Sequence, residues 1–140
     1  MATASKESPS ENRARLRRAA RLSAVREHRF GASGEAPEFV EADEDFFESL
    51  VAGVVERQAD VDPAMDALLA DKWRLERLDA TVRAILRVGG FELLYRKDVP
   101  ARVVIDEYIE VANAFFEGAE PKFINAAFDR CARGARPDEF

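Results

Sequence analysis

The chain has 140 residues, of which 47% are hydrophobic and 34% are charged, a composition typical of one soluble globular domain with its own core. No run approaches the roughly 18 apolar residues that a membrane-spanning helix needs, and the charged N-terminus lacks the apolar stretch of a secretory signal. A single cysteine excludes an intrachain disulfide and fits a reducing compartment, so we expect a cytoplasmic protein that does not bind membranes.

The net charge of −6 is unevenly distributed along the chain. Residues 1–30 carry eight basic and three acidic side chains, a net charge of +5, whereas residues 31–140 carry 13 basic and 24 acidic ones, a net charge of −11. A basic arm on an acidic body indicates a polyanionic partner for the arm, usually nucleic acid. The alternative is a solvated tail that folds back onto the acidic body, and charge alone does not decide between the two.

The first 42 residues divide into a tail and an arm. Residues 1–10 are small and polar and predict a disordered tail. Residues 11–42 predict an arginine-rich helix that ends near Arg29, followed by a loop with glycines and a proline. The apolar stripe of this helix consists of small residues, so it would dock weakly, and arginines surround most of its circumference.

The helical body is predicted to span residues 43–135. Asp43 is a suitable N-cap for its first helix, which carries paired apolar residues at helical spacing. The sequence then predicts a new, short helix, with Asp62 as its cap, Pro63 at its first position and an end near Asp71.

Three further helices follow in the predicted body. The first begins after the cap Asp79 and contains Gly89-Gly90, a pair that usually permits another helix to pass close by. The second begins after Pro100, and the third begins at Pro121. Each carries large apolar side chains at helical spacing on one face, as a helix that packs against a core does.

The fold class predicted from these elements is all-α, a compact helical bundle with short connections. No segment shows the sustained alternation of apolar and polar residues that is typical of a strand. Residues 136–140 follow the last helix, and we expect them to fray as a tail.

No set of residues predicts catalysis or metal binding. His28 is the only histidine and has no ligating neighbour, and Cys131 lies on an apolar stripe, where a buried hydrophobic role is expected. Asp106, Glu107 and Glu110 lack the histidine partners of a di-metal site, so we expect them to form a solvated acidic surface. The sequence therefore predicts a protein that is not an enzyme and needs no cofactor.

Basic and aromatic side chains predict binding instead. The arginines of the arm suit contacts with phosphates, and arginine-rich segments often order only when they bind RNA. Phe123 lies beside Lys122 at the edge of an apolar stripe, where its ring is placed to stack on an unpaired base. Ordinary core packing is the alternative role for Phe123.

Several motifs stand in the same order as in the NusB family of bacterial transcription antitermination factors. They are Leu78-Asp79, RAILR at 83–87, ELLYR at 92–96, DVP at 98–100, VVI at 103–105 and KFIN at 122–125. The chain resembles this family over about residues 43–135, and HRFG at 28–31 and ARPDEF at 135–140 resemble alphaproteobacterial forms.

This resemblance implies an all-helical fold of two subdomains that binds the boxA element of ribosomal RNA transcripts together with the small-subunit ribosomal protein NusE. It further implies antitermination as part of a transcription elongation complex. The residues that the resemblance places in RNA binding are Arg13, Arg15, Arg17, Arg18, Arg21, Lys122, Phe123 and Asn125. It places Glu120 and Pro121 in contact with the ribosomal-protein complex.

The chain departs from the family pattern near its N-terminus. After Ala24-Val25 it reaches the HRFG motif almost at once, where the family runs through more helix. The N-terminal subdomain is therefore predicted to lack part of its first two helices. Asp106 also stands where the family commonly has asparagine. The alternative function is a helical protein-interaction module that has lost RNA binding through this shortened region.

Overall fold

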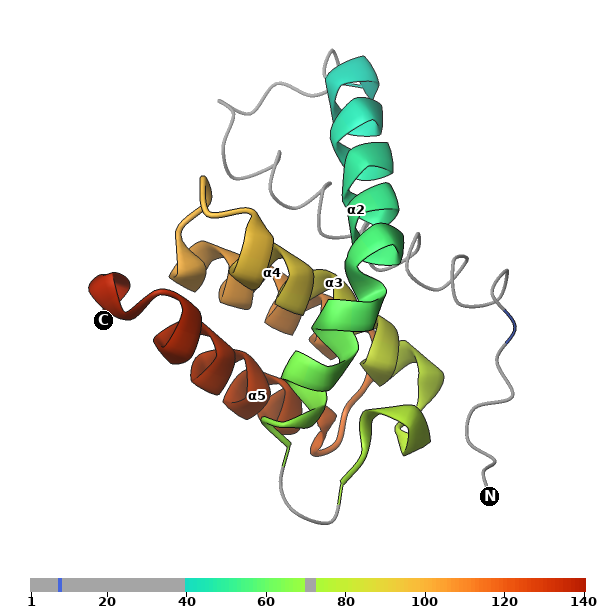
Figure 1. Ribbon diagram of the computed structural model, residues 1–140. Coiled ribbons are helices and arrows are strands. Elements are labelled where there is room, and N and C mark those ends of the chain that lie inside the picture. The colour runs from blue at the N-terminus through green and yellow to red at the C-terminus, as the bar shows by residue number, and fades with distance from the viewer. Residues whose placement is uncertain (1–7, 9–39, 70–72) are drawn as a thin grey trace.

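The computed structural model describes residue 8 and residues 40–69 and 73–140 (Figure 1). All regular structure in these residues is helical, which confirms the predicted all-α class. The elements, in chain order, are α2 (Val40–Asp66), the 3-10 turn η2 (Leu75–Arg77), α3 (Ala80–Tyr95), α4 (Ala101–Phe115), α5 (Glu120–Ala135) and the 3-10 turn η3 (Pro137–Glu139).

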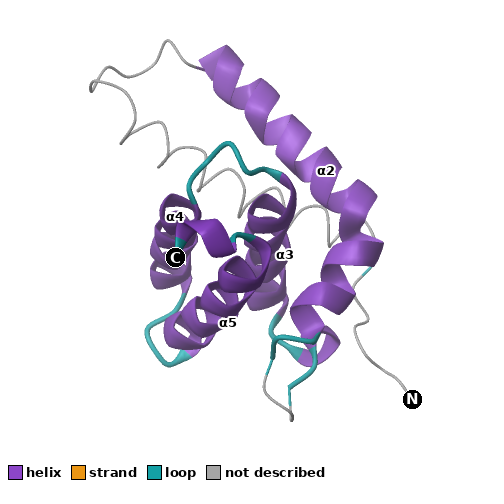
Figure 2. Cartoon of the chain, turned by 60° about the vertical axis from the view of Figure 1, so that its left-hand side comes forward, coloured by secondary structure: helices purple, strands orange, loops and turns teal. Residues whose placement is uncertain are grey.

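Helix α3 is the centre of the body (Figure 2). It packs against α2 on one side and against α4 and α5 on the other, and α4 and α5 also pack against each other. Residues 82–93 of α3 are buried, so this helix has no solvent-exposed stripe over most of its length. The largest fully buried side chains come from all four helices, namely Tyr108, Phe128, Leu50, Met65, Ile85, Leu86, Leu93 and Ile124.

The glycine pair of α3 lies where two other helices approach it. A Cβ atom on Gly89 would overlap the ring of Phe128 from α5, and one on Gly90 would lie 2.7 Å from the Sδ atom of Met65 from α2. Each glycine therefore gives room to a different neighbour. The predicted close approach at this pair is confirmed.

The predicted starts of the three C-terminal helices are also confirmed. The Asp79 carboxylate caps α3, since it accepts hydrogen bonds from the backbone N–H groups of Thr81 at 2.8 Å and Val82 at 3.3 Å. Helix α4 begins directly after Pro100, and α5 begins at Glu120 with a proline in its first turn.

The predicted break before Pro63 is wrong, because α2 is one helix that starts at Val40 and continues through Pro63 to Asp66. Asp62 does not cap a new helix. Its carboxylate binds the Arg87 guanidinium of α3 through two hydrogen bonds of 2.8 and 2.9 Å. Pro63 removes one helical hydrogen bond. The continuation of α2 past Pro63 is stabilised by the contact of Asp62 with α3 and by the burial of Met65.

The end of α2 also differs from the prediction. The helix stops at Asp66 rather than near residue 71, and residues 70–72 lie outside the described part of the chain. The Asp66 carboxylate accepts a hydrogen bond of 2.8 Å from the backbone N–H of Leu75. This contact joins the end of α2 to the start of η2.

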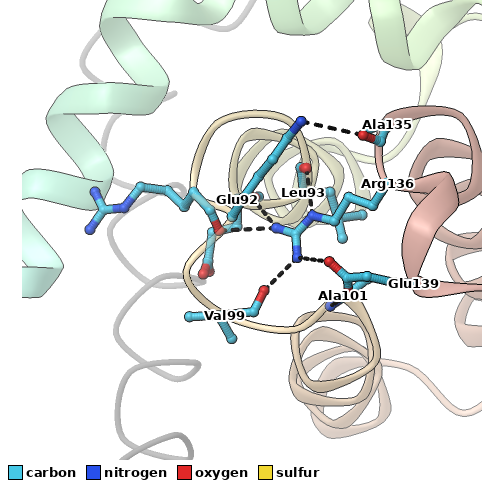
Figure 3. Close-up of polar contacts among 9 residues, drawn as sticks. Glu92, Leu93, Val99, Ala101, Ala135, Arg136 and Glu139 are labelled. Carbon is cyan, nitrogen blue, oxygen red and sulfur yellow. Dashed lines mark hydrogen bonds and ion pairs between the residues drawn. The ribbon is translucent and has the colours of Figure 1, made fainter.

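The predicted fraying of residues 136–140 is wrong as well, because Arg136 anchors them to the body (Figure 3). Its side chain is buried, and its guanidinium donates hydrogen bonds to backbone carbonyls at the end of α3 and in the turn before α4. The acceptors are the carbonyls of Glu92 at 2.9 Å, Leu93 at 3.1 Å, Arg96 at 3.0 Å and Val99. We call this set of contacts the Arg136 clasp. It provides donors for carbonyls at and just beyond the end of α3, of which the Glu92 carbonyl also accepts the backbone N–H of Arg96.

Two further contacts reinforce the Arg136 clasp. Glu139 forms an ion pair with Arg136 at 3.3 Å and also accepts a hydrogen bond of 2.7 Å from the backbone N–H of Ala101 (Figure 3). The Lys97 ammonium donates to the carbonyl of Ala135 at 3.3 Å. The C-terminal residues therefore join α3, α4 and α5.

Candidate nucleic-acid interface

The predicted site residues fall into two groups. Arg13, Arg15, Arg17, Arg18 and Arg21 lie outside the described residues, as does His28. The other five all lie in the first two turns of α5, namely Glu120, Pro121, Lys122, Phe123 and Asn125. The structure therefore tests the relative placement of the second group only.

Helix geometry divides this second group between two faces. Lys122 and Asn125 are three residues apart, so they share one face of α5, and both are exposed. Phe123 precedes Asn125 by two residues, which separates their directions by about 200° around the helix. Phe123 is half-buried and packs against the edge of the core. The structure thus brings Lys122 and Asn125 together and does not place Phe123 with Asn125.

The neighbour of Phe123 is Trp73, which lies just before η2 and belongs to none of the predicted helices or motifs. The two rings meet edge to face, with centroids 5.7 Å apart and an interplanar angle of 61°. The Trp73 side chain is 51% exposed, although large aromatic side chains are usually mostly buried. The signal that was missed is a lone tryptophan outside any apolar stripe.

These two aromatic rings border a hollow of about 290 Å³, which we call the Trp73 hollow. It lies between the residues of η2, the first turn of α3 and the start of α5. Its lining consists of Trp73, Arg77, Leu78, Asp79, Val82, Ala119, Glu120 and Phe123.

The segment that carries Trp73 and Arg77 is fixed to the body at several points. The backbone N–H of Leu75 donates to Asp66, and the Arg83 guanidinium donates to the carbonyls of Leu78 at 3.0 Å and Glu76 at 3.4 Å. The Asp79 cap then fixes the entry into α3. The backbone on this side of the Trp73 hollow is therefore held by α2 and α3.

The charges of the Trp73 hollow nearly balance. Arg77 contributes a cation, and Asp79 and Glu120 contribute two carboxylates. Helices α3 and α5 both begin here, and the N-terminal end of a helix carries a partial positive charge that offsets a nearby carboxylate. The arrangement suits a ligand with both donors and acceptors on an apolar ring.

A second hollow, of about 450 Å³, follows the outer side of α4 and is lined by Val103, Asp106, Glu107, Ile109, Glu110 and Asn113. The predicted acidic surface is confirmed for Asp106 and Glu110, which are exposed. It is wrong for Glu107, which is buried because it lies one turn from both Val104 and Val111 on the buried face.

The remaining chemistry-bearing residues are structural. Cys131 is buried on α5, as predicted, and burial raises the pKa of its thiol to about 11, against the opposing effect of nearby Arg136. Within residues 40–69 and 73–140, no three His, Cys, Asp or Glu side chains are grouped as metal ligands. The same residues contain no helix long and apolar enough to cross a membrane.

The sequence matches the family model described as the NusB family over residues 12–133. The Transcription antitermination protein NusB of Maricaulis maris is 87% identical, and the alignment covers all of both chains. That of Caulobacter vibrioides is 56% identical over 79% of this chain and 74% of the relative. A solved structure of T. maritima NusB superimposes with a TM-score of 0.67 at 31% identity, covering 91% of this chain and 96% of that one.

The alignment with the Maricaulis maris protein also bears on the length of this chain. It spans 160 positions and covers both proteins from end to end, so at least 20 internal positions face a gap in the 140 residues present here. An identity of 87% over 160 positions means that nearly every residue of this chain has an identical counterpart. This agrees with a missing internal stretch, and its predicted place after Val25 stays a prediction.

Proposed function

The chain belongs to the NusB family, and from that premise we propose that it is a transcription antitermination factor. We propose further that it binds boxA-type RNA of ribosomal RNA transcripts together with the small-subunit ribosomal protein NusE, within a transcription elongation complex. The observation that carries the proposal is the 87% identity, over the full length of both chains, to a protein named for transcription antitermination. The role is one of binding and involves no catalytic step.

The proposed RNA contacts come from two parts of the chain. The arginines of the arm, Arg13, Arg15, Arg17, Arg18 and Arg21, neutralise phosphates, and each such contact adds affinity that falls with salt. Lys122 and Asn125 on the exposed face of α5 contact the RNA backbone, and Phe123 contacts a base. Glu120 and Pro121 begin the same helix and contact the ribosomal-protein partner.

The test is an electrophoretic band shift with boxA-type RNA, with and without NusE, at salt concentrations from about 50 to 200 mM. Replacing Arg17, Arg18 and Arg21 with alanine should flatten the slope of log affinity against log salt by about 2 to 3, since each phosphate contact contributes about 0.7 to 0.9. Arg102→Ala is the matched control, because this arginine is exposed on α4 and outside the proposed interface. Binding that is absent in both conditions, or that does not fall with salt, contradicts the proposal.

The second candidate is a helical protein-interaction module that has lost RNA binding through its shortened N-terminal region. The gap of at least 20 positions relative to the Maricaulis maris protein favours it, as does the acidic and partly apolar hollow on α4. Capture of NusE without any affinity for RNA would support this candidate over the first. A large loss of RNA affinity in the triple arginine variant would exclude it.

A further inference from the structure

We propose that the hollow along α4 is a docking site for a basic amphipathic helix of a protein partner other than NusE. We call it the α4 hollow, and its described lining consists of Val103, Asp106, Glu107, Ile109, Glu110 and Asn113. The inference goes beyond the proposed function, because the occupant is neither RNA nor the ribosomal protein. It also places this partner on α4 rather than on the start of α5.

Helix α4 lies at the edge of the body, on the far side of α3 from α2 (Figure 2). It packs against α3 and α5. Exposed residues follow its outer side at intervals of three, four and three positions, namely Val103, Asp106, Glu110 and Asn113. This spacing forms a seam about 15 Å long, at a rise of about 1.5 Å per residue. It is the spacing along which a second helix packs against the first.

The charges of the α4 hollow favour a cationic occupant. Asp106, Glu107 and Glu110 bring three carboxyl groups to it, and no basic residue belongs to its described lining. Asp106 and Glu110 are like charges four residues apart, an arrangement that slightly destabilises an isolated helix. Lysines or arginines four residues apart on a facing helix would lie opposite these two carboxylates. The Trp73 hollow has no such preference, because it contains Arg77.

The apolar side chains of the α4 hollow require an amphipathic occupant. Val103 is 39% exposed, and the half-buried Ile109 lies one turn from both Asp106 and Asn113. An aliphatic side chain of the occupant can cover Val103 and Ile109. Neighbouring lysines or arginines can reach the carboxylates at the same time, because their long stems are apolar and only their tips are charged.

The arm of this chain, residues 11–29, is also basic, yet it suits the α4 hollow less well than a protein partner does. Its apolar stripe consists of small residues, which bury little area. Its arginines bind phosphates in the proposed function, on which this choice of occupant rests, so RNA would compete with the hollow for them. A partner helix with larger aliphatic side chains and its own lysines or arginines avoids that competition.

The probe is a fluorescently labelled peptide of about 20 residues, long enough to form a helix, with leucines and lysines on one face at the spacing of the α4 seam. A peptide of the same composition in scrambled order is its control. Fluorescence anisotropy measures the affinity of each for the full chain. We expect saturable binding that weakens as salt rises, and binding of the scrambled peptide that is weaker by about tenfold or more. Absence of saturable binding, or equal binding of both peptides, overturns the inference.

Two double variants test the seam itself, each checked for fold by circular dichroism. Asp106→Lys with Glu110→Lys should weaken binding of the peptide by about tenfold or more, because like charges then face each other. Glu56→Lys with Glu117→Lys is the matched control, since it changes the net charge equally at exposed positions outside the hollow. The neutral pair Asp106→Asn with Glu110→Gln replaces the first variant if that chain does not fold, and it should weaken binding by about threefold. Equal losses in the seam variant and its control overturn the inference.

Band shifts with boxA-type RNA and pull-down of NusE separate this inference from the proposed function. The seam variant and its control should bind RNA alike and NusE alike. If the seam variant binds RNA more tightly than its control, the arm is the occupant and the inference is overturned. If it loses NusE, the hollow belongs to the NusE interface and the inference is again overturned. If the peptide binds as expected and no RNA binds under any condition, the proposed function is overturned and the docking site stands.

Discussion

Gly89 offers a sharp test of the close approach between α3 and α5. In Gly89→Ala the new Cβ would overlap the ring of Phe128. That ring is fully buried and packs edge to face against Tyr108, with centroids 6.1 Å apart, so any displacement of it disturbs the packing of the core. The substitution should therefore force α5 away from α3.

The expected magnitude follows from two opposing effects. Alanine is favoured over glycine inside a helix by about 1 kcal/mol, whereas an extra methyl group in a well-packed core costs about 1 to 3 kcal/mol. Because the overlap at Gly89 is severe, we expect the free energy of unfolding to fall by about 1 to 2 kcal/mol. Gly134 in α5 is the matched control, since a Cβ there meets no atom within 4 Å. Gly134→Ala should raise the free energy of unfolding by about 0.5 kcal/mol.

Urea denaturation followed by circular dichroism measures both changes, with similar m values expected for all chains. In a chain that already carries Phe128→Leu, Gly89→Ala should lower the free energy of unfolding by less than it does in the unaltered chain, because the overlapping ring is then absent. A Gly89→Ala chain as stable as the unaltered one would refute the argument. It would mean that the ring moves aside freely and that the glycine gives no needed space.

Three further changes test the buried polar groups. Arg136→Met should lower the free energy of unfolding by about 3 to 5 kcal/mol because it strands buried carbonyls, whereas Arg133→Ala, on the exposed side, should change it by less than about 0.5 kcal/mol in the same urea assay. The pKa of Cys131 lies at about 11 against an ordinary 9.0. The contribution of this thiol to the free energy of unfolding is therefore fully present below pH 9 and should fall by about 2 to 3 kcal/mol as the pH rises to 11. Cys131→Ala should remove that decline. Tyr108→Phe deletes the hydroxyl that donates a hydrogen bond to Glu92 at 2.5 Å. It should lower the free energy of unfolding by about 1 to 3 kcal/mol, measured by thermal unfolding.

Features of the fold that depend on local chemistry were predictable from the sequence. The Asp79 cap and the proline at the start of α5 act within one helical turn, and the structure has both. The glycine pair at 89–90 also signalled close packing correctly. The continuation through Pro63 was not predictable in this way, because it depends on the pairing of Asp62 with Arg87, 25 residues along the chain.

The candidate site was predictable only in part. The motif on α5 identified Phe123, and helical phase alone already separates its direction from that of Asn125. Trp73 was missed because a single aromatic residue in a connection has no periodicity to mark it. Arg136 resembles every other arginine in the sequence, and its burial is decided by carbonyls of residues 92–99, which reach it only in the folded body.

The Arg136 clasp has a consequence for synthesis on the ribosome. Helices α3 and α4 leave the exit tunnel well before residues 136–139, so the carbonyl of Leu93 and the N–H of Ala101 lack their Arg136 and Glu139 partners when they first emerge. The nascent body cannot reach its final packing until these last side chains have emerged. Completion of the fold is therefore timed to the end of translation of this segment rather than to the appearance of its central helix.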